Sequence, residues 1–228
     1  MASRKGRERA SNEGTALKKG YDPFSSRRLG VLISGRGSNL QSIIDAIATG
    51  RLDATLAVVV SNRAEAQGLQ RARDAGIETR VLRGRDYADR DTYDAALADL
   101  LLAVPVDLVC LAGFMRLVGP AMLTAFPEHI LNIHPSLLPA FPGLEAQRQA
   151  LEHGVRVSGA TVHFVTAELD GGPIVLQAQV PVRDDDTVDT LSARILVEEH
   201  RIYPEAIQLL LDGGWSIEGR RFVRYRSR

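Results

Sequence analysis

The chain has 228 residues, of which 45% are hydrophobic, so it is long enough to bury one sizeable core. Its 28 Lys and Arg residues balance 28 Asp and Glu residues, which gives no indication of a nucleic-acid partner or of binding to an acidic membrane. The single cysteine, Cys110, and the lack of any apolar run near the roughly 18 residues of a membrane span exclude an internal disulfide and favour a soluble, cytoplasmic protein.

Residues 1–28 differ in composition from the rest of the chain. They carry eight Lys and Arg residues against three acidic ones and show no periodic apolar face. This composition is typical of a disordered basic tail. A nucleic-acid arm or a targeting segment is the alternative, although the acidic residues and the missing hydrophobic stretch argue against a signal peptide. We therefore expect a tail over 1–28 and a single domain over 29–228.

Short apolar runs alternate with helical patterns up to about residue 133. The runs predict strands over 29–34, 54–61, 78–82, 107–112 and 129–133, and the intervening segments predict helices over 38–50, 66–76 and 90–103, with a short helix after Gly119-Pro120. Strands that are almost continuously apolar and separated by helices indicate a parallel sheet covered on both faces. The order predicts an α/β, Rossmann-like fold.

The pattern changes after Pro142. A helix is predicted over 146–154, followed by strands over 157–165 and 172–182, whose short connection indicates an antiparallel pair added to the sheet. A long helix over 186–214 follows, capped by Thr187 or a neighbouring Asp and kinked near Pro204. One short strand within 215–225 is expected to end the fold.

A glycine-rich turn over 35–39 joins the first strand to the first helix. Unpaired N–H groups and the helix dipole favour an anion there, and glycine lets a ligand approach the backbone. The dinucleotide-binding pattern needs a further glycine where Leu40 stands, and no acidic residue follows the second strand, which ends at 61–63. We therefore expect a single phosphate, with Arg36 as a possible aid. The alternative is a tight turn with Ser38 as an N-cap and no ligand.

Asn132 and His134 are two residues apart at the end of the fifth predicted strand. Residues i and i+2 of a strand share a face, so both side chains project together. Pro135 ends the strand at the carboxyl edge, where open α/β sheets bind ligands. An amide can stabilise an oxyanion and an imidazole can move a proton near neutral pH. The alternative is a histidine satisfied by local hydrogen bonds and an asparagine closing a turn.

A carboxylate that orients the imidazole is expected in the segment 168–173, where Asp170 precedes two glycines. The remaining histidines show no spacing typical of a metal site, so no metal is expected. For one of them, His163, core packing is the preferred interpretation. No serine or cysteine lies in a recognisable nucleophile turn, which is compatible with direct acyl transfer to an amine.

The motifs SGRGSNL, LAGFMR, LNIHPSLLP, FPG and HFVTAELDGGPI, spread over about Leu29 to Gly213, resemble those of the folate-dependent formyltransferases. Within that group the chain most resembles the phosphoribosylglycinamide formyltransferases of purine biosynthesis. The Asn-X-His-Pro-Ser motif with a downstream Asp is highly specific for the superfamily, and GSN after the first strand indicates the ribonucleotide substrate. The resemblance implies transfer of a formyl group from 10-formyltetrahydrofolate, as cosubstrate, to the amine of phosphoribosylglycinamide.

The resemblance also implies roles for individual residues. Asn132, His134 and Asp170 match the catalytic residues, and Gly37, Ser38, Asn39 and Glu199 match contacts to phosphoribosylglycinamide. Contacts to the folate are implied for Arg90, Met115, Arg116, Leu117, Val118, Asn132, Thr166, Ala167, Glu168, Leu169 and Asp170. Without the resemblance, Met115 and Leu117 are equally well read as core residues, Arg90 as a solvated charge and Glu199 as a surface residue. Small-molecule substrates, no nucleic-acid or membrane partner, and a monomer or weak homodimer are expected.

One segment departs from the family pattern. The family often has histidines just after the proline-glycine turn, where this chain has Glu145 and Gln147, so a substrate contact from this segment is in doubt. Three other functions are compatible with parts of the pattern. A formyltetrahydrofolate hydrolase is expected to carry an additional N-terminal domain, and a methionyl-tRNA formyltransferase an additional C-terminal one. A nucleotide-binding module without chemistry leaves the Asn, His and Asp placement unexplained.

Overall fold

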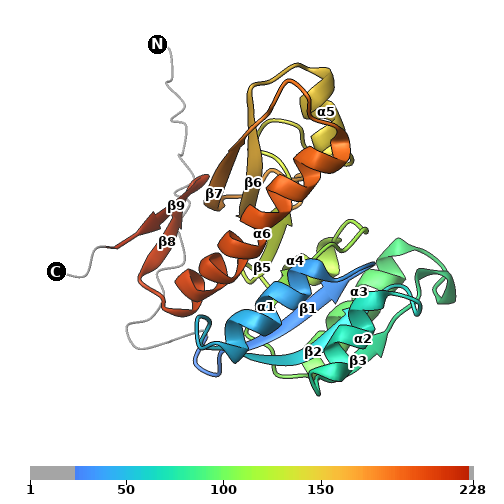
Figure 1. The fold of residues 1–228 in the computed structure, drawn as a ribbon. Helices are drawn as coiled ribbons and strands as arrows, with labels where there is room; N and C mark the ends of the chain where they lie inside the picture. Colours follow the sequence, from blue (N-terminus) through green and yellow to red (C-terminus); the bar gives the residue numbers. More distant parts are fainter. Residues whose placement is uncertain (1–23, 226–228) are drawn as a thin grey trace, which may run out of the picture.

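One sheet of nine strands runs through residues 24–225, the part of the chain that the computed structural model describes (Figure 1). Its strand order is β3-β2-β1-β4-β5-β6-β7-β9-β8. The strands are β1 Arg28–Ile33, β2 Thr55–Ser61, β3 Thr79–Val81, β4 Leu108–Leu111, β5 Ile130–His134, β6 Val157–Phe164, β7 Ile174–Pro181, β8 Trp215–Glu218 and β9 Arg221–Arg224. The helices are α1 Ser38–Ala48, α2 Gln67–Asp74, the 3-10 helix η1 Gly84–Asp86, α3 Arg90–Ala103, α4 Pro120–Ala125, α5 Ala146–Glu152 and α6 Val188–Leu211.

Strands β1 to β5 form the parallel half that the apolar runs predict. The central strands β1, β4 and β5 are buried on both faces, because helices cover the sheet from both sides, whereas the edge strand β3 is largely exposed. On β1, Val31 and Ile33 lie in the core beneath α1, α2 and α6, whereas Leu32 lies in the core beneath α3 and α4. The mostly parallel α/β fold expected from the sequence is therefore confirmed.

Strands β6 and β7 extend the sheet in antiparallel order, as predicted. The end of the chain differs from the prediction of one terminal strand. Residues 215–225 form two antiparallel strands, β8 and β9, with Gly219 at positive φ in the turn between them. Strand β9 joins the sheet by pairing in parallel with β7, with Ile174 opposite Arg221. The prediction of a single strand was wrong because Gly219 allows the chain to reverse in the middle of this segment.

Helix α6 is the long helix expected near the C-terminus. Thr187 and Thr190 form a reciprocal capping box at its start, which confirms the predicted cap. The helix continues through Pro204 as one element to Leu211. At residue 203, next to this proline, the hydroxyl of the buried Tyr203 donates to the carbonyl of Leu111 at 2.9 Å and ties the helix to β4.

The folded part begins before residue 29. Phe24 is 1% exposed and packs against the rings of His129 and Trp215. Arg27 forms ion pairs with Asp53 and Asp212, both at 3.0 Å. Residues 24–28 therefore belong to the domain, contrary to the expected boundary. Residues 1–23 lie outside the described part, so a disordered basic tail remains a prediction for them. Within residues 24–225, no helix is both long and apolar enough to cross a membrane.

Candidate active site

The glycine-rich turn after β1 is held in a left-handed conformation. Gly37 has φ 70°, and a Cβ at this position would lie 2.6 Å from the Cα of Gly68 in α2. The N–H of Gly68 donates to the carbonyl of Gly35 at 3.0 Å, so the turn packs directly on α2. Gly37 is itself the N-cap residue of α1, with no side-chain cap bond, and Ser38 is the first helical residue. The alternative role of Ser38 as an N-cap is therefore wrong.

Asn39 and Glu199 link this turn to α6. The Asn39 amide Nδ2 donates to the Glu199 carboxylate at 2.6 Å, and both residues are buried. Burial raises the pKa of Glu199, an effect that the Asn39 hydrogen bond partly opposes. The Asn39 Oδ1 atom is buried and has no hydrogen-bond partner among the described residues. Because an unsatisfied buried acceptor is costly, this amide is a good candidate for contact with a ligand.

Strands β5 and β6 bring two polar pairs onto one face of the sheet. Asn132 lies opposite His163, and His134 lies opposite Thr161. Residues that face each other in an antiparallel pair project to the same side, so Asn132, His134 and His163 share a face. Asn132 and His134 lie at the carboxyl end of β5, which ends just before Pro135.

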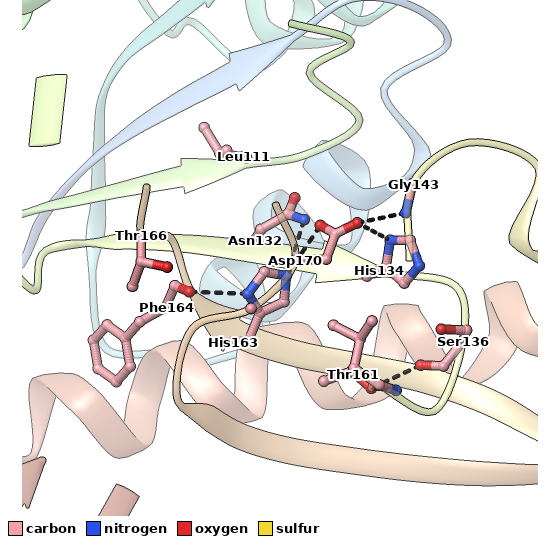
Figure 2. Close-up of polar contacts among 12 residues, drawn as sticks. Leu111, Asn132, His134, Ser136, Gly143, Thr161, His163, Phe164, Thr166 and Asp170 are labelled. Carbon is pink, nitrogen blue, oxygen red and sulfur yellow. Dashed lines mark hydrogen bonds and ion pairs between the residues drawn. The ribbon is translucent and has the colours of Figure 1, made fainter. Parts of the chain in front are cut away.

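His134 makes contacts through both of its ring nitrogens, and Figure 2 shows the one with Asp170. Its Nε2 lies 2.9 Å from the carbonyl oxygen of Phe141, which can only accept, so Nε2 carries a proton. Its Nδ1 lies 3.4 Å from Oδ2 of Asp170, and the histidine side chain is only 6% exposed. Nδ1 therefore faces the buried carboxylate of Asp170.

Asp170 reaches the imidazole from a tight turn. Its φ is 50°, a left-handed conformation that is costly for a residue with a side chain. Its Oδ2 also accepts from the backbone N–H of Gly143 at 2.8 Å. The following Gly171 and Gly172 leave no room for a Cβ, because Glu168 and the Phe164 carbonyl pack against them. This turn confirms the expectation that Asp170 is aimed inward towards His134.

His163 lies in the same cluster, contrary to the sequence interpretation of core packing. Its Nδ1 lies 2.9 Å from the carbonyl oxygen of Phe164, so Nδ1 is the protonated nitrogen of the neutral ring. Its Nε2 then accepts from the Asn132 amide at 3.2 Å and lies 3.6 Å from Oδ1 of Asp170. Burial lowers the pKa of His163, which favours this neutral form. The spacing of Thr161 and His163, two residues apart in a mostly apolar strand, is the sequence feature that could have indicated a common polar face.

Comparison with known proteins decides the family. Residues 27–207 match the family model described as formyl transferase. The chain is 51% identical to phosphoribosylglycinamide formyltransferase of Escherichia coli (strain K12) over 183 residues, which are 80% of this chain and 86% of that protein. It superimposes on glycinamide ribonucleotide transformylase 1 from Symbiobacterium toebii with a TM-score of 0.86 and 63% identity, covering 87% of this chain and 94% of the other.

The chain belongs to the phosphoribosylglycinamide formyltransferases. It is thus an enzyme of the formyltransferase class, with the Rossmann-like fold of that family. It is also 48% identical to the trifunctional purine biosynthetic protein adenosine-3 of Homo sapiens over 186 residues. That match covers 82% of this chain but 18% of the human protein. The resemblance that the sequence motifs suggest is confirmed at the level of the family.

Most of the residues expected to contact the folate of a formyltransferase lie on two separated segments, and Arg90 in α3 and Asn132 in β5 lie outside them. One segment, 115–118, follows β4. The guanidinium of Arg90 reaches the Val118 carbonyl at 3.4 Å, and that of Arg116 lies 4.2 Å from the centre of the Tyr93 ring. Met115 and Leu117 are 62% and 55% exposed, which excludes the alternative that they are core residues.

The second segment is the Thr166–Asp170 loop between β6 and β7. Thr166, Ala167, Glu168 and Leu169 are exposed there, and only the Asp170 carboxylate is buried. An exposed Leu169, at 55%, is typical of a site wall that a ligand would cover. The loop therefore presents an apolar side chain next to the buried Asp170 carboxylate.

The two departures from the formyltransferase pattern have local roles. Glu145 is the N-cap residue of α5, at positive φ, and pairs with Arg148 at 3.3 Å. Gln147 is partly buried in the same helix. Neither observation places these side chains against Asn132, His134 or Asp170. Among the residues that the structure describes, no group of three His, Cys, Asp or Glu side chains is arranged to hold a metal ion.

Proposed function

We propose that the chain transfers the formyl group of 10-formyltetrahydrofolate to the amine of 5-phosphoribosylglycinamide. The products are the N-formyl ribonucleotide and tetrahydrofolate, in a step of de novo purine biosynthesis. The observation that carries the proposal is the convergence of Asn132, His134 and Asp170 at one strand edge. The names of the similar proteins support the choice of reaction.

Asn132 is proposed to stabilise the negative charge that develops on the formyl oxygen. One of its amide N–H groups is used by His163, which fixes the rotation of the side chain. The other N–H then has a defined direction. A donor that is already oriented needs no reorganisation when the oxyanion forms, and this is the usual source of a large rate enhancement.

His134 and Asp170 are proposed to handle the proton. When the substrate amine adds to the formyl carbon, the carbonyl electron pair moves to oxygen, and the new C–N bond leaves a positive charge on the amine. The amine must lose one proton, and N10 of the folate must gain one as its bond to carbon breaks. Nδ1 of His134 lies beside the Asp170 carboxylate, which stabilises the imidazolium formed in between.

A covalent route through a protein thiol is disfavoured. Cys110 is fully buried in β4, and burial raises the pKa of its thiol to about 12. The thiolate is the nucleophile, so this cysteine is not suited to carry the formyl group. Direct attack by the amine therefore remains the simplest mechanism for this site.

We propose one position for each of the two substrates. The turn Gly37–Asn39 with Glu199 is proposed to hold the phosphate and ribose of the ribonucleotide. The folate is proposed to lie between segment 115–118 with Arg90 and the Thr166–Asp170 loop. No metal is proposed. We propose that the enzyme works in the cytoplasm as a monomer or weak homodimer, with small-molecule substrates and without nucleic-acid or membrane partners.

The test is the acceptor dependence of folate turnover. The absorbance change of 10-formyltetrahydrofolate is followed with and without phosphoribosylglycinamide. We expect conversion only when the ribonucleotide is present, with one formylated ribonucleotide formed per folate consumed. Loss of the formyl group at the same rate without acceptor would instead identify water as the acceptor and the chain as a hydrolase. No conversion under either condition would overturn the proposal.

A further inference from the structure

The C-terminal hairpin reaches the loop that carries Asp170. Arg220, in the turn between β8 and β9, donates from Nη1 to the Glu168 carboxylate at 2.8 Å. Its Nη2 donates to the backbone carbonyl of Gly171 at 2.6 Å. One guanidinium thus bridges the two sides of the turn whose centre is Asp170. The hairpin lies outside residues 27–207, the part of the chain that the formyl transferase model matches.

The hairpin is anchored so that it can act as a fixed support. Trp215 of β8 and Phe222 of β9 pack on each other with ring centres 5.6 Å apart, and both pack on the buried Phe164 of β6. Strand β9 is hydrogen-bonded to β7, with Arg221 opposite Ile174 (Figure 1). The residue just before Arg221 is therefore set at the edge of the core rather than on a loose end.

Besides the contacts of the Asp170 carboxylate with Gly143, His134 and His163, the loop has few hydrogen bonds of its own. Within it, the N–H of Gly171 donates to the Glu168 carbonyl at 3.2 Å, and the Thr166 hydroxyl contacts the same carbonyl at 3.4 Å. Asp170 adopts a positive φ, which is costly and persists only where the surroundings hold it. A small displacement of Asp170 would change its 3.4 Å contact with His134. Misplacement of a catalytic group by about 1 Å can lower the reaction rate about 100-fold.

We propose that Arg220 is a positioning residue, which clamps the 168–171 turn so that the Asp170 carboxylate stays against His134 and the folate side of the site stays closed. The guanidinium is suited to this task because its planar fork presents several donors at once, to a carboxylate and a carbonyl. A lysine keeps the charge but does not reproduce the fork. The proposal rests on the proposed function, because it assigns Asp170 to the formyl transfer.

Arg220 is expected to matter for turnover and not for global stability. Arg220 and Glu168 are 68% and 64% exposed, and exposed ion pairs contribute little to stability. Loss of the clamp should therefore leave the melting temperature within about 2 °C of wild type while the loop opens locally. Arg221 provides a matched control, since it is the next residue, is also an exposed arginine, and shows no side-chain bond among the described residues.

The experiment compares Arg220→Ala, Arg220→Lys and Arg221→Ala in the full chain. We expect Arg220→Ala to lower kcat about 10-fold and to raise KM for 10-formyltetrahydrofolate several-fold, with KM for the ribonucleotide within twofold. Arg220→Lys is expected to recover only part of the loss, and Arg221→Ala to behave as wild type. Equal loss in the Arg221 variant, or unchanged kcat and folate KM in Arg220→Ala, would overturn the clamp.

A second measurement is independent of activity. Hydrogen exchange of the backbone amides of residues 169–171 is expected to be at least 10-fold faster in Arg220→Ala and in Glu168→Gln, and unchanged in Arg221→Ala. Unchanged exchange in both variants would contradict the clamp even if the enzyme transfers formyl groups normally. Faster exchange in an enzyme without acceptor-dependent activity would support the clamp and reject the proposed function.

Discussion

Asn132 and His163 form a cross-strand pair in which the Asn132 amide donates to Nε2 of the imidazole at 3.2 Å. The second ring nitrogen of His163 is occupied by the Phe164 carbonyl. The amide group of Asn132 is therefore locked in one orientation. If Asn132 makes the proposed contact with the formyl oxygen, the buried His163 supports that contact.

Replacing His163 should reduce turnover more than substrate binding. In His163→Ala the Asn132 amide loses its acceptor and rotates away from the direction needed at the formyl oxygen. We expect kcat to fall by about 10- to 100-fold, since complete removal of such a donor costs roughly 10²–10³ in kcat. Steady-state kinetics would show it, with His129→Ala at the opposite end of β5 as the control. A kcat equal to that of wild type would exclude this supporting role.

Replacing Glu199 by Gln should affect stability and ribonucleotide binding in opposite directions. Burial raises the pKa of Glu199, so the native state disfavours its charged form. Between pH 4.5 and the raised pKa the native state binds more protons than the unfolded state, and stability falls as the pH rises. Glu199→Gln keeps an acceptor for Asn39 and removes this loss. Its melting temperature relative to wild type should therefore increase from pH 4.5 to pH 8, whereas KM for the ribonucleotide rises.

Melting curves of the wild type and of Glu199→Gln from pH 4.5 to pH 8 test the sign of the pH dependence of their difference in melting temperature. A difference that stays constant with pH, or that shrinks above neutrality, would contradict the raised pKa of the buried Glu199 carboxyl.

A methyl group at Gly37 should disturb the phosphate turn. Alanine at φ 70° is strained, and its Cβ would lie 2.6 Å from the Cα of Gly68. Strain and overpacking together should cost about 2–4 kcal/mol and raise KM for the ribonucleotide. Gly35→Ala is a matched control, because nothing lies within 4 Å of a Cβ there. Thermal unfolding of the two variants is the measurement, and equal melting temperatures would count against the close packing of this turn.

Removing the guanidinium of Arg116 should weaken folate binding alone. It stacks on Tyr93 at 4.2 Å, next to the exposed Met115 and Leu117. We expect Arg116→Ala to raise KM for 10-formyltetrahydrofolate about 10-fold, about 1.4 kcal/mol in binding, and to leave KM for the ribonucleotide unchanged. Tyr93→Phe keeps the ring and serves as the control. If the variant instead raises KM for the ribonucleotide, segment 115–118 does not hold the folate.

The sequence was sufficient for the features that depend on local patterns. Continuous apolar runs predicted the buried parallel strands, and the i, i+2 spacing of Asn132 and His134 predicted their common face. The glycines after Asp170 predicted a sharp turn. In each case the physical cause lies within a few residues of the feature itself.

What the sequence left open depends on long-range register and packing. His163 reaches the site only because β6 pairs with β5 so that residue 163 lies opposite residue 132. From sequence alone, Phe24 is assigned to a basic tail. Its contacts with the rings of Trp215 and His129 are visible only in the structure. Arg220 contacts the Asp170 turn only because the C-terminal segment reverses at Gly219 and returns along β7. Such contacts join residues that no local window contains.

The turnover number of purified Asp170→Asn tests the central assignment most directly. The substitution keeps the size of the side chain but removes the charge that stabilises a protonated His134, so we expect kcat to fall by roughly 10²–10⁴-fold. Thermal unfolding should show that the variant remains folded. A folded Asp170→Asn enzyme with nearly wild-type kcat would contradict proton handling by the His134–Asp170 pair.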